Sequence, residues 1–246
     1  PLDKIGATFI LSDPALVTTA MYVVYAERRG YLPEVLRMNA SHVIYRQWFW
    51  DERTFPPENA HKLMVEYIAH RIRYMSRRHH HTNIPGYNPA EAGATPVQEV
   101  AFSLACAKAI TEECMKVGLD PDDVVPGFYY HAHFGSDFFE EIAKLRAYRR
   151  MWARMFKEQF GCKSPDSLRI EMCPQTAGMS LTRQEPLNNI IRNTIATLGL
   201  ALAGVDQIFT TAYDEALCTP TEEAARIAIR TQQIIYHETN IPNVAD

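Results

Sequence analysis

Mostly apolar and mostly polar segments alternate along the chain in a way that predicts strands and helices in turn. Residues 5–11 form a mostly apolar run that is typical of a buried strand, and a helix-start signal follows at Ser12-Asp13-Pro14. The next positions predict a helix from about Ala15 to Arg29, ended by Gly30, a residue suited to the left-handed conformation. Further strands are predicted to begin near residues 38, 82, 127, 168 and 205, separated by helices over 58–78, 97–117 and 137–160 and after Thr182.

Specific signals support several of these helices. The predicted helix 137–160 has an apolar stripe made of Phe138, Phe139, Ile142, Leu145, Trp152, Met155 and Phe156. Thr182-Arg183-Gln184-Glu185 has the form of a capping box. Thr219-Pro220-Thr221-Glu222 predicts a last helix with Thr219 as its cap, proline at the first helical position and glutamate at the third. Six strand–helix repeats favour an α/β fold with helices covering a parallel sheet.

The stretch from Pro85 to Thr95 lies between the strand predicted at Thr82 and the helix predicted from Val97. Two prolines and two glycines within residues 85–93 predict a strand-to-helix loop and not a helix. Loops at the carboxyl ends of strands carry the chemistry in repeating β/α folds. The alternative is a simple turn without a function.

Composition adds limits on the class of protein. The 246 residues are 47% apolar and 22% charged, which fits one ordinary globular domain over residues 1–246. The formal net charge of -4 gives no reason to expect nucleic acid or a membrane surface as a partner. No apolar run approaches the roughly 18 residues of a spanning helix. The five scattered cysteines are typical of reduced thiols, so we expect a cytoplasmic protein.

Two histidine-rich segments invite a metal hypothesis. His79, His80 and His81 follow two arginines, and cations at a helix carboxyl end explain them better, since adjacent helical residues point about 100° apart. In the strand predicted from residue 127, Tyr129, His131 and His133 share one face. The strand histidines could bind a metal with Glu171, donate a proton or hydrogen bond through His131, or be satisfied interior residues. We expect no metal.

Four ordered motifs resemble the methylmalonyl-CoA mutase family, the adenosylcobalamin-dependent acyl-CoA mutases. The motifs are G-Y-x-x-x-E-A-G-A-T at Gly86, E-I-A-K-L-R-A at Glu141, Q-T-A-G at Gln175 followed by S-L-T and N-N, and Y-D-E-A-L at Tyr213 followed by P-T. The resemblance spans the chain and implies an incomplete (β/α) TIM-type barrel of about six βα units, similar to units three to eight of the family. The first two units are expected upstream or on another chain.

The resemblance implies a cofactor side of the site. Glu91 and Glu215 match the glutamates that lie near the adenosyl group in the family, where carboxylates can accept hydrogen bonds from ribose hydroxyls. Gln175 and Gly178 match the motif that lines the corrin ring. The alternative for Glu91 is a role at its own helix start. The family's cobalt-ligating D-x-H-x-x-G motif does not occur here, so a separate cobalamin-binding domain or subunit is expected to hold the cobalt.

The substrate side departs from the family pattern. Thr8, Asn39, Ser41 and Tyr129 fall on expected substrate-binding positions, but the arginine that pairs with the methylmalonyl carboxylate falls on Trp50 or Asp51. A CoA-phosphate arginine falls on Gly127. Tyr87 is kept and Asn88 stands where the family has its active-site histidine, so His131 is the candidate for the missing acid or hydrogen-bonding work.

These matches favour the barrel portion of a mutase that rearranges an acyl-CoA other than methylmalonyl-CoA by radical chemistry. Trp48, Phe49 and Trp50 suit a bulky apolar acyl group. The main alternative is a non-catalytic structural barrel subunit of a mutase complex, and an unrelated metal-dependent hydrolase using His131 and His133 is weaker. Expected partners are an acyl-CoA, the cobalamin-binding component and further copies in an oligomer.

Overall fold

A computed structural model describes residues 2–4, 6–10, 15–41, 57–75 and 80–244 of the chain. It divides into two compact units built from alternating stretches. The first unit contains Pro1–Pro85, Ser103–Tyr129 and Trp152–Ile170, and the second contains Gly86–Phe102, Tyr130–Met151 and Glu171–Asp246. We describe each unit by itself.

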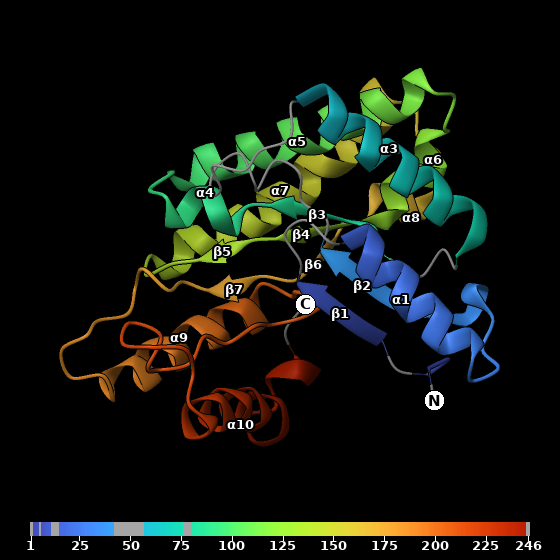
Figure 1. Cartoon of the computed structure of the whole chain (residues 1–246). Helices are drawn as coiled ribbons and strands as arrows, with labels where there is room; N and C mark the ends of the chain where they lie inside the picture. Colours follow the sequence, from blue (N-terminus) through green and yellow to red (C-terminus); the bar gives the residue numbers. More distant parts are fainter. Residues whose placement is uncertain (1, 5, 11–14, 42–56, 76–79, 245–246) are drawn as a thin grey trace. The chain divides into compact units, whose positions relative to one another are not determined.

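The first unit begins with a β-α-β arrangement. Strand β1 (Gly6–Ile10) is parallel to β2 (Arg37–Ser41), with Gly6 opposite Arg37, and helix α1 (Ala15–Glu27) and a short 3-10 turn η1 (Pro33–Val35) connect them. Figure 1 shows α1 beside this strand pair. Tyr22 and Ala26 of α1 are buried against Met38 of β2 in one apolar cluster. The helix predicted from Ala15 is confirmed, and Gly30 has the expected left-handed backbone, with φ +81°.

The rest of the first unit packs around aromatic side chains. It contains α3 (Pro57–Tyr74), β3 (Thr82–Pro85), the later part of α5 (Pro96–Lys116), α6 (Pro121–Val124), η2 (Val125–Gly127), the start of β4 (Phe128–His131), the end of α7 (Phe138–Gln159) and α8 (Pro165–Leu168). The Trp152 ring lies edge-on to Phe128 at 6.1 Å and 4.4 Å from the Phe156 ring. Its indole N–H donates to the Ser167 carbonyl at 3.1 Å, so this buried polar group is satisfied.

The prediction that His81 is a cation at the carboxyl end of a helix is wrong. His81 directly precedes β3 and is 3% exposed, and burial lowers the pKa of its imidazole to about 3, so it is neutral and not a helix-end cation. Its Nε2 lies 2.9 Å from the Val124 carbonyl, which can only accept, so Nε2 carries the proton. Nδ1 therefore accepts from the Thr82 hydroxyl at 2.9 Å.

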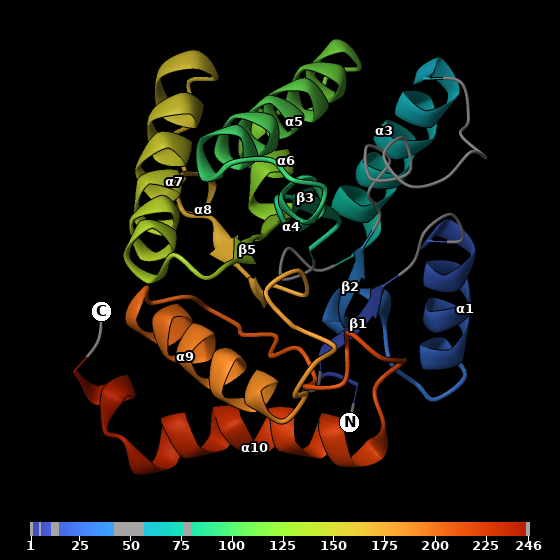
Figure 2. The same cartoon turned by 90° about the vertical axis from the view of Figure 1, so that its left-hand side faces the viewer.

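The second unit holds short parallel strands. In this unit the end of β4 and β6 (Glu171–Met172) are neighbours, and β5 (His133–Phe134) is parallel to β7 (Gln175–Thr176), with His133 opposite Gln175. An isolated parallel bridge joins Gln175 to Phe209. The unit's helices are α4 (Tyr87–Glu91), the first parts of α5 and α7, α9 (Asn188–Leu202), α10 (Glu222–Glu238) and η3 (Ile241–Asn243). Helices α9 and α10 lie side by side (Figure 2).

Parallel strands alternating with helices confirm the predicted α/β class, but several local predictions are wrong. Tyr87–Glu91 is a short helix despite Pro89, because Pro89 occupies the first turn, where a backbone N–H has no helical partner. Thr182 caps no helix, since its hydroxyl donates to the Gln184 carbonyl and α9 begins only at Asn188. The cap of α10 is Thr221, whose Oγ1 accepts from the Ala224 N–H at 3.3 Å.

Four further segments differ from the predicted pattern. The strand predicted from residue 205 is reduced to the bridge at Phe209, and the strand predicted at 168–173 is shortened to β6 because α8 runs to Leu168. The strand predicted at 128–134 is divided into β4 and β5. On α7, Phe139 was predicted to belong to the apolar stripe but is 80% exposed. Two charged residues of the same helix, Glu141 and Lys144, are buried.

Replacing Gly127 by alanine should destabilise the first unit by about 1–3 kcal/mol, the usual cost of overpacking. A Cβ at this position would lie 2.1 Å from Nε2 of His81, and the His81 ring is held by one hydrogen bond at each nitrogen. Chemical denaturation followed by circular dichroism measures the change in the free energy of unfolding. His81→Ala makes room, so the double variant should cost less than the sum of the two single variants. Additive costs would contradict the steric explanation.

Candidate active site

Glycine at position 86 sets the start of the segment that carries the candidate site. A Cβ on Gly86 would lie 2.6 Å from the Tyr130 ring and 2.7 Å from Glu99 Oε1, so the backbone can pass here only without a side chain. The Gly86 N–H donates to the His131 carbonyl at 2.9 Å. Helix α4 begins at the next residue and presents Tyr87 and, one turn later, Glu91.

Tyr87 is the centre of the candidate site. Its hydroxyl oxygen accepts from Gln175 Nε2 at 3.2 Å and from the Gly178 N–H at 3.4 Å. Its ring stacks on the His131 ring, with centroids 5.1 Å apart and an interplanar angle of 15°. Burial and the negative charge of Glu91 raise the pKa of Tyr87, so the phenol stays protonated at neutral pH.

Glu91 is held by two segments of the second unit. Its carboxylate accepts from the Met179 N–H, at 3.0 Å to Oε2 and 3.3 Å to Oε1, and Oε1 lies 3.3 Å from His133 Nε2. A Cβ on Gly178 would lie 3.3 Å from both Glu91 Oε2 and the Tyr87 hydroxyl. Glycine therefore lets the Gln175–Gly178 segment approach the two α4 side chains closely.

Glu215 belongs to the same group and lies in the loop before α10, which hydrogen bonds to Asp214 stabilise. Asp214 Oδ2 accepts from the Thr221 N–H at 2.9 Å and from its hydroxyl at 2.8 Å, which closes the turn before α10. Partial desolvation, the charge of Asp214 and the charge of Glu91 raise the pKa of Glu215. The carboxylates of Glu91 and Glu215 thus lie near enough to influence one another.

A buried ion cluster lies behind the candidate site. Lys144 Nζ is 2.6 Å from Glu99 Oε2, 2.6 Å from Glu141 Oε2 and 2.7 Å from the His133 carbonyl oxygen. Glu99 Oε1 also accepts from the Tyr130 hydroxyl at 2.8 Å and from the His133 N–H at 3.0 Å. The side chains of Lys144 and Glu99 are 2% and 1% exposed. Charge pairing and complete hydrogen bonding make such a cluster tolerable in the interior.

The predicted site residues divide between the two units. Six of them belong to the second unit and are linked to one another by contacts or charge interactions: Tyr87, Glu91, His131, Gln175, Gly178 and Glu215. Asn88 is buried beside Tyr87 on α4. Thr8 lies opposite Asn39 in the pairing of β1 with β2, Ser41 ends β2, and Tyr129 is buried in β4, all within the first unit. Trp50 and its alternative Asp51 lie outside the described residues.

The metal hypothesis finds no site in the part of the chain that the structure describes. There, no group of three histidine, cysteine, aspartate or glutamate side chains is arranged to hold a metal ion. Glu171, the suggested third ligand, accepts from Gln207 Nε2 at 2.7 Å. His131 and His133 both lie near the Tyr87 ring, with centroid distances of 5.1 and 5.9 Å. These contacts assign the two histidines to the group of side chains around Tyr87 and favour a hydrogen-bonding or charge role over metal binding.

A model of the family described as methylmalonyl-CoA mutase matches residues 1–246. The chain belongs to the methylmalonyl-CoA mutase family. It is 35% identical, over its whole length, to 44% of the 2-hydroxyisobutanoyl-CoA mutase large subunit of Aquincola tertiaricarbonis. It is also 36% identical to 34% of the methylmalonyl-CoA mutase of Escherichia coli K12 and to 33% of a probable mitochondrial methylmalonyl-CoA mutase of Caenorhabditis elegans. The chain spans less than half the length of these relatives.

Gly127 is one of the positions where the sequence was predicted to depart from the methylmalonyl-CoA mutase family. Gly127 stands where the family resemblance places an arginine, and His81 occupies the space that a side chain there would enter. A cation cannot be restored at position 127 without moving His81.

The buried cluster was not predicted from the sequence of this mutase-family chain. Glu141 and Lys144 belong to a motif that carried the family resemblance, but no role was attached to either. The available signal was a pair of opposite charges three residues apart on an otherwise apolar helix face. Glu99, three residues into α5, looked like an ordinary acidic residue of a first helical turn.

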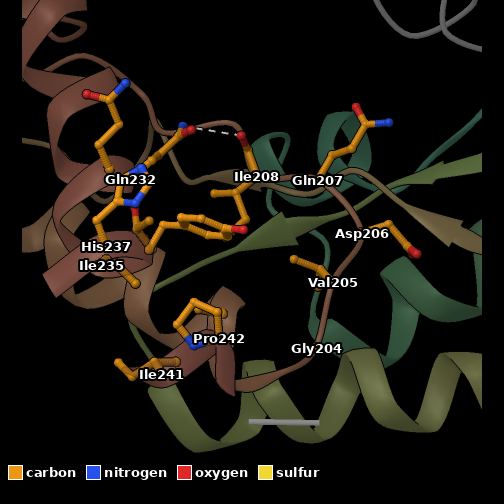
Figure 3. A pocket seen from close by; sticks show the side chains of 14 residues that line it. Gly204, Val205, Asp206, Gln207, Ile208, Gln232, Ile235, His237, Ile241 and Pro242 are labelled. Carbon is orange, nitrogen blue, oxygen red and sulfur yellow. Dashed lines mark hydrogen bonds between the residues drawn. The ribbon is translucent and has the colours of Figure 1, made fainter. Parts of the chain in front are cut away.

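A separate cavity of about 570 Å³ lies in the second unit, away from the mutase-family motifs. Figure 3 shows it between the Gly204–Ile208 segment, the end of α10 and η3, with Gln232 donating to the Ile208 carbonyl at 3.2 Å. Its lining includes the apolar residues Val205, Ile235 and Pro242 and none of the predicted site residues.

Among the described helices, none is both long and apolar enough to cross a membrane.

Proposed function

We propose that this chain is the barrel portion of an adenosylcobalamin-dependent mutase that rearranges the carbon skeleton of an acyl-CoA lacking a free carboxylate on its acyl group. The barrel would correspond to units three to eight of the family and form one domain over residues 1–246. The observation that carries the proposal is the gathering of Tyr87, Glu91, Gln175, Gly178 and Glu215. Three sequence segments supply these residues.

The donor set fits the cofactor that the family uses. When bound, adenosylcobalamin supplies a carbon radical by homolysis of its cobalt–carbon bond. Glu91 and Glu215 offer carboxylate acceptors that suit the hydroxyls of a ribose. Gly178 leaves room that a side chain would fill, because a Cβ there already meets Glu91 and Tyr87 at 3.3 Å. We expect a separate cobalamin-binding domain or subunit to hold the cobalt.

On the substrate side, the chain's own residues would orient the acyl-CoA and keep water away. Tyr87 can donate a hydrogen bond but, with its raised pKa, cannot readily ionise. Its stacking partner His131 can supply the proton or the positive charge that Asn88 cannot. Thr8, Asn39, Ser41, Trp50 and Tyr129 are the proposed contacts to the acyl-CoA.

The substrate proposal rests on the position of the lost arginine. Trp50 and Asp51 cannot form a bidentate ion pair with a carboxylate, and Asp51 would repel one. Among the relatives, the Aquincola protein is named for 2-hydroxyisobutanoyl-CoA, whose acyl group has no free carboxylate. This relative shows that the family contains members named for substrates other than methylmalonyl-CoA.

The complete protein, assayed with its cobalamin-binding component, should use a branched acyl-CoA such as 2-hydroxyisobutanoyl-CoA at least about a hundredfold better than methylmalonyl-CoA, by kcat/KM. An unpaired buried carboxylate costs several kcal/mol, and about 2.7 kcal/mol already gives that ratio. Trp50→Arg and Asp51→Arg are the matched variants, one of which should improve methylmalonyl-CoA turnover. Equal turnover of both substrates by the unmodified protein would refute the substrate class. Cofactor binding without any acyl-CoA turnover would favour a structural subunit.

A further inference from the structure

His133 connects the candidate cofactor side to the buried ion cluster. It lies in β5 with 7% of its side chain exposed, and its two ring nitrogens face two carboxylates. Nε2 is 3.3 Å from Glu91 Oε1, and Nδ1 is 3.8 Å from Glu141 Oε1. The family resemblance assigned no role to this histidine, and only a metal hypothesis had drawn attention to it.

The contact with Glu91 depends on charge more than on hydrogen-bond geometry. Nε2 has no well-aligned acceptor among the described residues, although the Glu91 carboxylate is within ion-pair distance. A neutral imidazole has one N–H and can donate to only one of the two carboxylates. An imidazolium carries a proton on both nitrogens and attracts both carboxylates at once.

The surrounding charges also favour the imidazolium. The ionisable groups that face His133 are Glu91 and Tyr87 from α4, Glu99 from α5, and Glu141 and Lys144 from α7. This group contains three carboxylates and one lysine, which pairs with Glu99 and Glu141, so a positive His133 reduces the excess negative charge. Burial opposes protonation, but the interactions with Glu141 and Glu91 outweigh it and raise the pKa of His133.

We propose that His133 is a positioning residue whose imidazolium holds the Glu91 carboxylate in place to receive the adenosyl group, so that the cofactor side of the site responds to pH. The inference rests on the proposed function. The Met179 N–H holds the same carboxylate from the other side. When His133 loses its proton, Glu91 keeps the Met179 contact but loses the attraction of the cation.

The sign of the pH effect follows from the raised pKa of His133. The interaction is fully present below the ordinary histidine pKa, near 6.5, and is lost as the pH rises through the higher folded-state value. Adenosylcobalamin should therefore bind more weakly at alkaline pH. A group whose pKa was lowered by its partners would give the opposite trend.

The coupling itself can be measured without the cofactor. In NMR spectra of the complete protein with labelled histidine imidazoles, the His133 signal, assigned by its loss in His133→Gln, should titrate above the ordinary histidine pKa. Glu91→Gln should lower that midpoint by about one pH unit, a tenfold change in proton affinity. His70, exposed on α3, is the control signal and should not move. An unchanged His133 midpoint in Glu91→Gln would overturn the proposal.

Cofactor binding tests the consequence. Adenosylcobalamin is titrated into the complete protein and its cobalamin-binding component, followed by absorbance, from about pH 6 to about pH 9. The unmodified protein and the control His70→Gln should lose about tenfold in affinity over this range. His133→Gln, checked by thermal melting, should bind about tenfold more weakly at pH 6 and show a flat profile. A normal pH profile in His133→Gln would reject the role of His133, whereas no binding by the unmodified protein at any pH would reject the proposed function.

Discussion

Replacing Lys144 by methionine should lower the free energy of unfolding by about 3–5 kcal/mol, the usual cost of breaking a buried ion pair by removing one partner. The methionine fills most of the volume, but Glu99 and Glu141 would then lie buried without the cation that neutralises them. Their oxygens are each 2.6 Å from Lys144 Nζ, and both side chains are at most 5% exposed. Urea denaturation followed by circular dichroism gives the change.

An exposed lysine on α5 provides the matched control. Lys108 pairs with Glu112 at 3.8 Å on α5, with about half of each side chain exposed. Lys108→Met should cost less than about 0.5 kcal/mol, because such surface pairs contribute little. Adding Glu99→Gln and Glu141→Gln to Lys144→Met should recover part of the loss, since neutral amides leave no uncompensated charge. A loss in Lys144→Met no larger than in Lys108→Met would show that the cluster does not depend on its cation.

The sequence pattern was enough to predict the positions of most elements. The strand near residue 6, the helix from Ala15 and the left-handed glycine at position 30 depend on contacts close along the chain. Apolar runs and helix-end signals encode such local features directly. The same holds for α5 and α7, whose predicted ends lie within one or two residues of the observed ones.

Predictions failed where tertiary contacts outweigh a local signal. Thr182 has the spacing of a capping box, yet its own backbone is held by Asn189. The Asn189 side-chain oxygen accepts from the Thr182 N–H at 3.1 Å, and the Asn189 amide donates to the Thr182 carbonyl. The proline rule wrongly excluded α4, because Pro89 falls in the first turn, where its missing N–H costs nothing.

For the candidate site, the sequence could indicate the residues that lie in motifs but not the contacts that depend on tertiary structure. Motif matches identified Glu91, Gln175, Gly178 and Glu215, and the contacts around Tyr87 bring these residues together. The link through His133 to Glu141, Lys144 and Glu99 could not be read from the sequence. It requires the facing sides of β5, α5 and α7 to be known, since the four residues span more than forty positions.

Changing Glu91 or Glu215 to glutamine should lower turnover by about ten- to a hundredfold. Each substitution keeps the size of the side chain but replaces a charged acceptor by a neutral one. Hydrogen bonds to charged groups contribute about 1.5–3 kcal/mol, which corresponds to that range of rates. The measurement is kcat/KM of the complete protein with its cobalamin-binding component, with the branched acyl-CoA as substrate.

Thermal melting of the same variants separates a cofactor role from a structural one. Glu91 is held by His133 and the Met179 N–H, so Glu91→Gln should also lower stability. Glu215→Gln should not, because partial burial and the charges of Asp214 and Glu91 already disfavour the ionised form of Glu215. Glu140→Gln, one residue from the cluster but exposed on α7, is the control and should change neither quantity. The decisive variant is therefore Glu215→Gln, for which lost turnover at unchanged melting temperature supports the cofactor role. Unchanged turnover in both Glu215→Gln and Glu91→Gln would leave a structural subunit as the better explanation of these carboxylates.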